Sequence, residues 1–193
     1  MGCVTIEPAQ VNLDASVFEG AVRLLACLEQ QLAGTVGGPV CRACLYPGAT
    51  VPMDACEASS DCSGVGGHGM AAVRVASSQL IVAQVQQRCS FTSAQVSVVY
   101  EMTAYRCAHT VTRNGGVPVL PTCDELASDT AIVLDDAAAM RRALKCCFTV
   151  PPSAGGCPPA ITNVSPWTPR GPVSGCMGGQ MQFTVTFNDC GCP

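Results

Sequence analysis

The sequence predicts an α+β domain in which an antiparallel sheet of about four strands carries two main helices on one face. Two segments, residues 17–33 and 123–147, repeat apolar side chains at the three- and four-residue spacing of an amphipathic helix. Strands are expected over about 70–110 and 180–189, and residues 96–105 and 181–187 within them alternate side chains between two faces, as strands with one buried face do. The order helix, strands, helix, strand and the length of 193 residues suit one domain, 1–193.

The first predicted helix has a start signal, an apolar stripe and a stop signal. Ser16 and Glu19 are spaced as a capping box, in which each side chain bonds a free backbone N–H group. Gly34 offers the left-handed conformation that ends many helices. The apolar stripe consists of Phe18, Val22, Leu25, Leu28 and Leu32.

The second predicted helix has two independent signals. Thr122 and Glu125 are the ends of another capping box. Acidic residues occupy the first turns and basic residues the last turns, which complements the helix dipole. These charged residues are Asp124, Glu125 and Asp129, then Arg141, Arg142 and Lys145. The apolar stripe consists of Val133, Ala137, Met140, Leu144 and Cys147.

The remaining segments are predicted to be long loops rich in Cys, Gly and Pro. Residues 34–69 separate the first helix from the strands, and residues 149–179 carry Trp167 ahead of the final strand. A turn is expected between Asn114 and Pro118, where glycines and a proline interrupt the strand pattern.

The composition argues against nucleic-acid binding and against a membrane span. The net charge is −4, and no cluster of Lys and Arg is present to neutralise phosphates. The longest apolar runs are interrupted by Gln, Arg or Ser, so none has the length of a spanning helix. Only 12% of the residues are charged, which is typical either of a surface covered by partners or of a compositional bias towards Ala and Gly.

The sequence has fifteen cysteines but starts with a segment that does not resemble a secretion signal, so the cell compartment of the protein has to be inferred. Cysteine at such density is typical of secreted disulfide scaffolds or metal proteins. The first residues, Met1 to Pro8, have neither the basic nor the apolar region of a secretion signal. We therefore expect synthesis in a reducing cytoplasm and release by a route such as cell lysis, which virus particles use.

A zinc site is one alternative for the cysteines. Cys41 and Cys44 have the spacing of a zinc knuckle, and Cys56 and Cys62 could complete four sulfur ligands. Cys56 and Cys62 are too far apart for a second tight pair, so disulfides or free thiols are favoured over a metal. No cofactor is predicted.

Disulfide partners do not follow from spacing. Cys147 continues the helix stripe and is expected in the core, which leaves the adjacent Cys146 to meet a loop cysteine such as Cys157 or Cys176. The disulfide candidates are Cys41, Cys44, Cys56, Cys62, Cys89, Cys107, Cys146, Cys157, Cys176, Cys190 and Cys192.

No pattern in the sequence predicts an enzyme. His68 and His109 are the two histidines that could assist a cysteine nucleophile, and neither lies in a recognisable catalytic context. There is no phosphate-binding loop and no nucleophile elbow. We therefore expect a protein without catalytic activity.

Partner contacts are expected from two loops, residues 34–69 and 110–121. Trp167 and Arg170 are the residue types that most often anchor interfaces, although Trp167 could instead fix the conformation of its own loop. The interface candidates are Trp167, Arg170, Tyr46, His68 and Asn114.

Four places in the sequence carry a resemblance to a known family. They are a cysteine pair ahead of residues 70–76, a strand ending at Arg106 and Cys107, the helix end at residues 140–147, and the segment from Trp167 through Gly179. Together these resemble structural proteins from the head–tail gene block of phages of actinobacteria. The order of elements is similar to that of tail terminators of long-tailed phages.

That resemblance implies a small α/β fold that assembles as a hexameric ring on the end of the tail tube. The implied partners are the tail-tube protein and a head-completion or connector protein, with DNA passing through the ring without specific binding. The implied location is the head–tail joint of the virion. A head-completion (stopper) ring of the same gene block is the alternative role.

Overall fold

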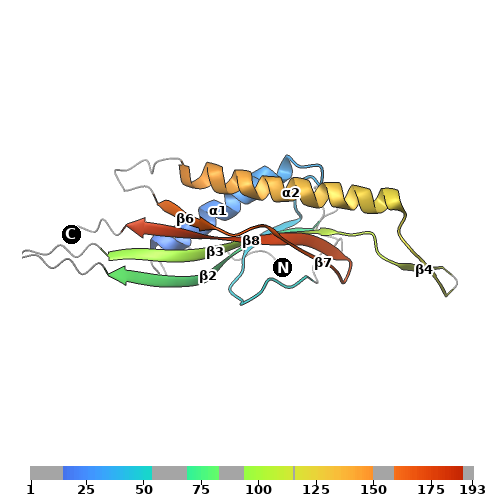
Figure 1. Ribbon diagram of the computed structural model, residues 1–193, viewed down its shortest axis with the longest axis horizontal. Coiled ribbons are helices and arrows are strands. Elements are labelled where there is room, and N and C mark those ends of the chain that lie inside the picture. The colour runs from blue at the N-terminus through green and yellow to red at the C-terminus, as the bar shows by residue number, and fades with distance from the viewer. Residues whose placement is uncertain (1–14, 54–68, 83–93, 115, 150–158, 189–193) are drawn as a thin grey trace, which may run out of the picture.

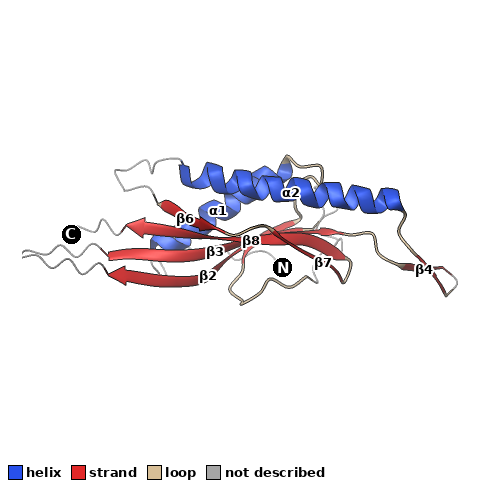
Figure 2. Ribbon diagram, viewed as in Figure 1, coloured by secondary structure: helices blue, strands red, loops and turns tan. Residues whose placement is uncertain are grey.

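The computed structural model describes residues 15–53, 69–82, 94–114, 116–149 and 159–188. The α+β prediction is confirmed, because two helices accompany a mostly antiparallel mixed sheet (Figure 2). The elements are α1 (Ala15–Ala33), β1 (Arg42–Leu45), β2 (Met70–Val82), β3 (Ala94–Cys107), β4 (Thr112–Asn114), β5 (Val117–Val119), α2 (Cys123–Thr149), β6 (Ala160–Val164), β7 (Thr168–Val173) and β8 (Cys176–Asn188).

The main sheet has six strands rather than the predicted four or so. Its order is β1-β2-β3-β8-β6, and β7 also pairs with β8. β1 runs parallel to β2, and the other pairs in this sheet are antiparallel. The long strands β2, β3 and β8 form its centre, as their alternating patterns predict.

The additional strands of the main sheet lie in the two segments predicted to be long loops. β1 falls within residues 34–69, and β6, β7 and the start of β8 fall within residues 149–179. The added strands β1, β6 and β7 are short, and β7 contains Pro169 and Pro172, residues found almost only at sheet edges. These short segments become strands because they pair with neighbouring strands. Their own sequences show little alternation that would predict them.

The start of α2 confirms one capping box. The Thr122 backbone N–H donates to Glu125 Oε2 over 2.7 Å, and the Glu125 N–H donates to Thr122 Oγ1 over 3.2 Å.

The capping box predicted for α1 is wrong, because α1 begins at Ala15 and places Ser16 inside its first turn. The predicted stripe of α1 is also rotated. Its buried apolar residues are Ala21, Leu24, Leu28 and Leu32, whereas Val22 is exposed and Leu25 half-buried.

The main core lies between the sheet and the two helices. α1 packs against α2 and β2, and α2 packs against β8 and β3 (Figure 1). Tyr100 of β3 is central, with its ring 5.7 Å from that of Phe183 and its hydroxyl donating to the Val17 carbonyl over 2.9 Å. This core holds the middle of β3 and β8 against the helices. It therefore sets the position of the end of β3 relative to α2.

A second, smaller apolar cluster lies near the ends of β2 and β3. It consists of Val51, Met70, Ala72, Tyr105 and Cys176, with Tyr46 and Met53 packed against it. Since Met70 and Ala72 alternate with the main-core residues Ala71 and Val73, this cluster is on the opposite face of the sheet. Residues 46–53 therefore cover part of the sheet surface that the helices do not.

Candidate functional site

The end of β3 brings three elements together. Arg106 is 2% exposed and forms two hydrogen bonds with Asp136 of α2: Nε to Oδ2 over 2.7 Å and Nη2 to Oδ1 over 3.0 Å. A two-bond Arg–carboxylate pair fixes orientation as well as distance. The pair therefore ties the end of β3 to the middle of α2.

Arg106 also organises the chain that follows α1. Its guanidinium donates to the backbone carbonyls of Gly38 (2.9 Å), Gly37 (3.1 Å) and Pro39 (3.4 Å). The Thr35 hydroxyl oxygen lies 3.0 Å from Asp136 Oδ1. Since a guanidinium has five N–H groups, these contacts use its donors within the fold, and Arg106 serves structure rather than ligand binding.

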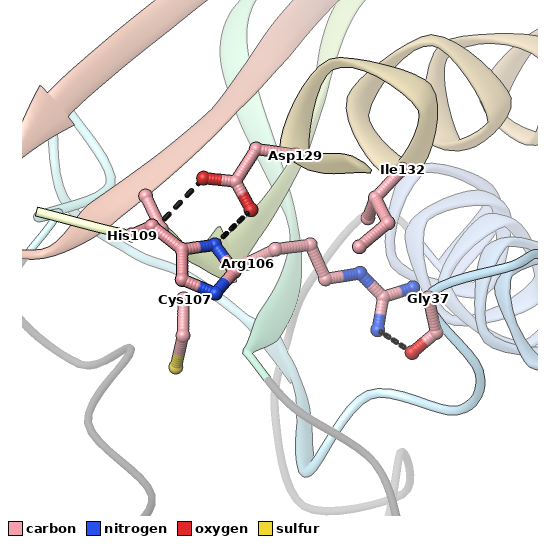
Figure 3. Close-up of a pocket in the computed structure, with 7 residues that line it drawn as sticks. Gly37, Arg106, Cys107, His109, Asp129 and Ile132 are labelled. Atoms are coloured by element: carbon pink, nitrogen blue, oxygen red, sulfur yellow. Dashed lines mark hydrogen bonds and ion pairs between the residues drawn. The ribbon is translucent and has the colours of Figure 1, made fainter. Parts of the chain in front are cut away.

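His109 lies just beyond β3 and is held by a second acidic residue of α2. Asp129 accepts from the His109 backbone N–H over 2.9 Å, and its other carboxylate oxygen lies 2.8 Å from His109 Nδ1 (Figure 3). Asp129 is buried, whereas the His109 side chain is half exposed. The hydrogen bond with Asp129 raises the pKa of His109 above its ordinary value. His109 is thus a fixed, titratable group at the surface.

An open cavity of about 280 Å³ lies beside this pair. Figure 3 shows the Cys107 sulfur directed away from the His109 ring. The Cys107 thiol and the His109 imidazole therefore do not face each other as a nucleophile and its base would. The cavity is lined by Gly37, Arg106, Cys107, Ala108, His109, Asp129 and Ile132.

A polar row crosses the centre of the sheet on the face away from the helices. Arg74, Glu101 and Gln182 are register partners on β2, β3 and β8. Glu101 accepts from Arg74 Nε (2.7 Å), Arg74 Nη2 (2.9 Å) and Gln182 Nε2 (2.6 Å). Burial raises the pKa of Glu101, but the bonds from Arg74 and Gln182 outweigh it, and its pKa falls below the ordinary value. Since Arg74 and Gln182 both donate to Glu101, this row of side chains has a structural role in the sheet.

The disulfide between Cys27 and Cys147 corrects the predicted pairing. It joins α1 to α2 with 6.2 Å between the Cα atoms. Cys147 is buried as predicted but is bonded, and Cys27 was not among the candidates. Cys146, predicted to reach a loop cysteine, is instead an exposed free thiol, as is Cys123.

The other predicted cysteines have varied positions. Cys41 and Cys176 are disulfide-bonded, which leaves Cys41 without the thiolate that the zinc alternative requires. Cys44 and Cys107 are half-buried. Across the described ranges, no group of three or more His, Cys, Asp or Glu side chains could hold a metal ion. The candidates outside the described residues are Cys56, Cys62, Cys89, Cys157, Cys190 and Cys192.

The interface candidates are also spread over the fold. Trp167 is half-buried, packs against the main core and contacts Gly179 so closely that a Cβ there would overlap the indole. Arg170 is exposed on β7, and Tyr46 packs against the second cluster. Asn114 ends β4, but its side chain is not described, and His68 lies outside the described residues.

The β4–β5 hairpin is the most exposed apolar surface near the site. It extends beyond the start of α2, at the opposite end of the molecule from the last residues of β8 (Figure 1). Four apolar side chains, here named the hairpin patch, are exposed: Val111 (53%), Val117 (64%), Val119 (46%) and Leu120 (73%). The predicted partner loop 110–121 contains this patch.

Sequence reasoning missed the residues that hold the base of the hairpin. From the sequence, Arg106 was predicted only as the end of a strand and Asp129 only as a helix charge. His109 was considered only as one of two histidines without a catalytic context. One signal was available: Arg106 closes a strand of alternating pattern, which hints at a buried cation needing an acidic partner. Which acidic residue pairs with Arg106 depends on tertiary packing, and in the structure it is Asp136.

The chain was also compared with known proteins. No model of a known protein family and no curated protein matches it. In the described part of the chain, neither helix has the length and apolar character needed to span a membrane.

Proposed function

We propose that this protein is a structural virion subunit that forms a ring at the head–tail joint of a long-tailed phage. In this role it ends growth of the tail tube and connects the tail to the head. The proposal assigns it no catalytic step and no cofactor. Its partners are further copies of itself, the tail-tube protein and the head-completion protein.

The hairpin patch carries the proposal. Val111, Val117, Val119 and Leu120 present apolar surface on a two-stranded unit that extends from the domain. Burying one such side chain contributes about 1.5–3 kcal/mol relative to leaving it in water. Exposed apolar surface gathered on a projecting element is typical of a contact surface.

The base of the hairpin is held firmly, as assembly requires. His109 is fixed to Asp129 on two atoms, and Arg106 is fixed to Asp136 and to the loop after α1. The disulfide between Cys27 and Cys147 links the two helices. A rigid connection between patch and body sets the angle between adjacent subunits, and that angle determines whether a ring closes.

The mechanism is geometric. A closed ring presents one face to the last ring of the tail tube and another face to the head. Growth ends because the outer face does not match a tube subunit. The low charge of the chain, net −4, suits a lumen through which DNA passes without binding. The resemblance described above supports a ring of six subunits.

The deciding experiment removes the gene from the phage and examines the lysate by electron microscopy. The proposal predicts tail tubes of uncontrolled length that are not joined to heads. Normal-length tails beside heads that have lost their DNA would identify the stopper role instead. Intact, infectious particles without the protein would contradict both roles.

A second experiment tests the hairpin patch itself. Val117→Asp with Leu120→Asp should abolish ring assembly, measured by native mass spectrometry, and leave the melting temperature unchanged. Val164→Asp is the matched control, since Val164 is 45% exposed on β6, away from the hairpin. If the hairpin variant forms rings as completely as the Val164→Asp control, the hairpin patch is excluded as the contact.

A further inference from the structure

Two free, exposed thiols lie at opposite ends of α2. Cys123 is its first residue, and Cys146 lies in its last turn. The Cys123 end adjoins the β4–β5 hairpin, whereas the Cys146 end lies towards the other side of the molecule (Figure 1). The helix therefore carries one reactive group at the end that bears the hairpin patch and one at the far end.

These two thiols cannot bond each other within one chain. The helical rise of about 1.5 Å per residue places them roughly 35 Å apart along the axis. A disulfide requires Cα atoms within about 7 Å of each other. A bond between Cys123 and Cys146 must therefore join two copies of the chain.

Charge favours the contact of unlike ends. At the Cys123 end of α2, Asp124, Glu125 and Asp129 are acidic, whereas Arg113 on β4 and the titratable His109 are the basic groups, so the balance is negative. Near Cys146, Arg141, Arg142 and Lys145 are exposed and positive. Two Cys123 ends would repel each other, as would two Cys146 ends, whereas unlike ends attract.

We propose that adjacent copies of this protein contact head to tail, with the Cys123 end of one α2 against the Cys146 end of the next, and that this contact becomes a disulfide when the assembled protein meets an oxidant. The inference rests on the proposed ring, because a head-to-tail contact repeats around a closed ring. The hairpin patch lies at the Cys123 end and is buried in the same contact.

The redox step balances with a small disulfide as oxidant. Cys123 and Cys146 of adjacent copies lose two protons and two electrons and form one S–S bond. Oxidised glutathione takes up those protons and electrons and becomes two thiols. Cell lysis would expose assembled particles to oxidants of this class or to dissolved oxygen.

The test mixes two single variants, Cys123→Ser and Cys146→Ser, with one of them isotope-labelled, under oxidised glutathione. The inference predicts a cross-linked pair in the mixture whose linking peptide joins Cys146 of the first variant to Cys123 of the second, identified by mass spectrometry. It predicts no Cys123–Cys123 or Cys146–Cys146 link in either variant alone. A symmetric link, or no mixed link, would overturn it.

Charge exchange supplies a second readout. Asp124→Lys alone and Arg141→Asp alone should each slow the cross-link by at least about tenfold, and the double variant should recover it, since the attraction is restored with reversed signs. Arg42→Asp is the control, because Arg42 is exposed on β1. Failure of the double variant to recover, with both single variants slowed, would overturn the charge pairing.

The outcomes separate this inference from the proposed function. A Cys123–Cys146 link between copies, together with infectious particles that form without the gene, would uphold the contact and reject the role at the head–tail joint. Overlong tails without the gene, together with symmetric cross-links only, would uphold the role and reject the head-to-tail contact.

Discussion

Arg106 and Asp136 form a buried two-bond ion pair that joins the end of β3 to α2, with side chains 2% and 5% exposed. Asp136→Asn would leave the guanidinium buried without its countercharge, and removing one partner of such a pair costs about 3–5 kcal/mol. Urea unfolding should show that loss. Asp135→Asn is the matched control, since Asp135 accepts one bond from the exposed Val36 N–H, and its cost should stay below about 1.5 kcal/mol. Equal costs would contradict the assignment.

The disulfide between Cys27 and Cys147 closes a loop of 120 residues. The double variant Cys27→Ala with Cys147→Ala should lose about 3–5 kcal/mol of unfolding free energy, because the unfolded chain regains the entropy of a long loop. The control replaces the two exposed thiols, Cys123→Ser with Cys146→Ser, and should change stability by less than about 0.5 kcal/mol. Unchanged stability of the first variant under oxidising conditions would argue that this disulfide does not form.

His109 and Asp129 predict a pH dependence with a definite sign. The folded-state pKa of His109 is raised by Asp129, so the folded protein binds the proton more tightly than the unfolded chain. The stabilisation from this pair is therefore complete below the unfolded pKa of about 6.5 and is lost as pH rises through the higher folded value.

Proton NMR of the imidazole would measure this directly, since the chain has two histidines. Asp129→Asn should lower the pKa of His109 towards its ordinary value and reduce the extra stability on the acid side. A His109 pKa that is equal in both proteins would show that the pair does not form in solution.

Trp167 and Gly179 predict a spectroscopic change. A Cβ at position 179 would overlap the indole, so Gly179→Ala should displace the single tryptophan, shift its emission to longer wavelength and cost about 1–3 kcal/mol. Gly34→Ala is the control, because the nearest atom to its Cβ is 3.7 Å away. An emission spectrum unchanged by Gly179→Ala would place Trp167 elsewhere.

These residues also show which features could be predicted from the sequence. The capping box of Thr122 and Glu125 was predictable because its partners are three residues apart. The long strands β3 and β8 were predictable because alternation over a dozen residues is a strong signal. The buried stripe of α1 was misplaced because Leu24 and Leu25 both suit a helical pattern, and only packing decides between them.

The rest depends on contacts distant in sequence. Cys27 pairs with a residue 120 positions away, and Arg106 chooses Asp136 over the adjacent Asp135 through tertiary packing. The edge strands β1, β6 and β7 owe their conformation to neighbours rather than to their own patterns. Loop 110–121 was predicted as a partner surface, yet its projection as a hairpin depends on how His109 and Asp129 fix the end of β3.

The most direct test of the central claim locates the protein in the particle. Phage carrying a peptide tag on this chain would be purified, labelled with gold-bound antibody to the tag and imaged by electron microscopy, with untagged phage as the control. We predict a single label position at the junction of head and tail. Label distributed along the tail, over the head shell, or absent from purified particles would contradict the account.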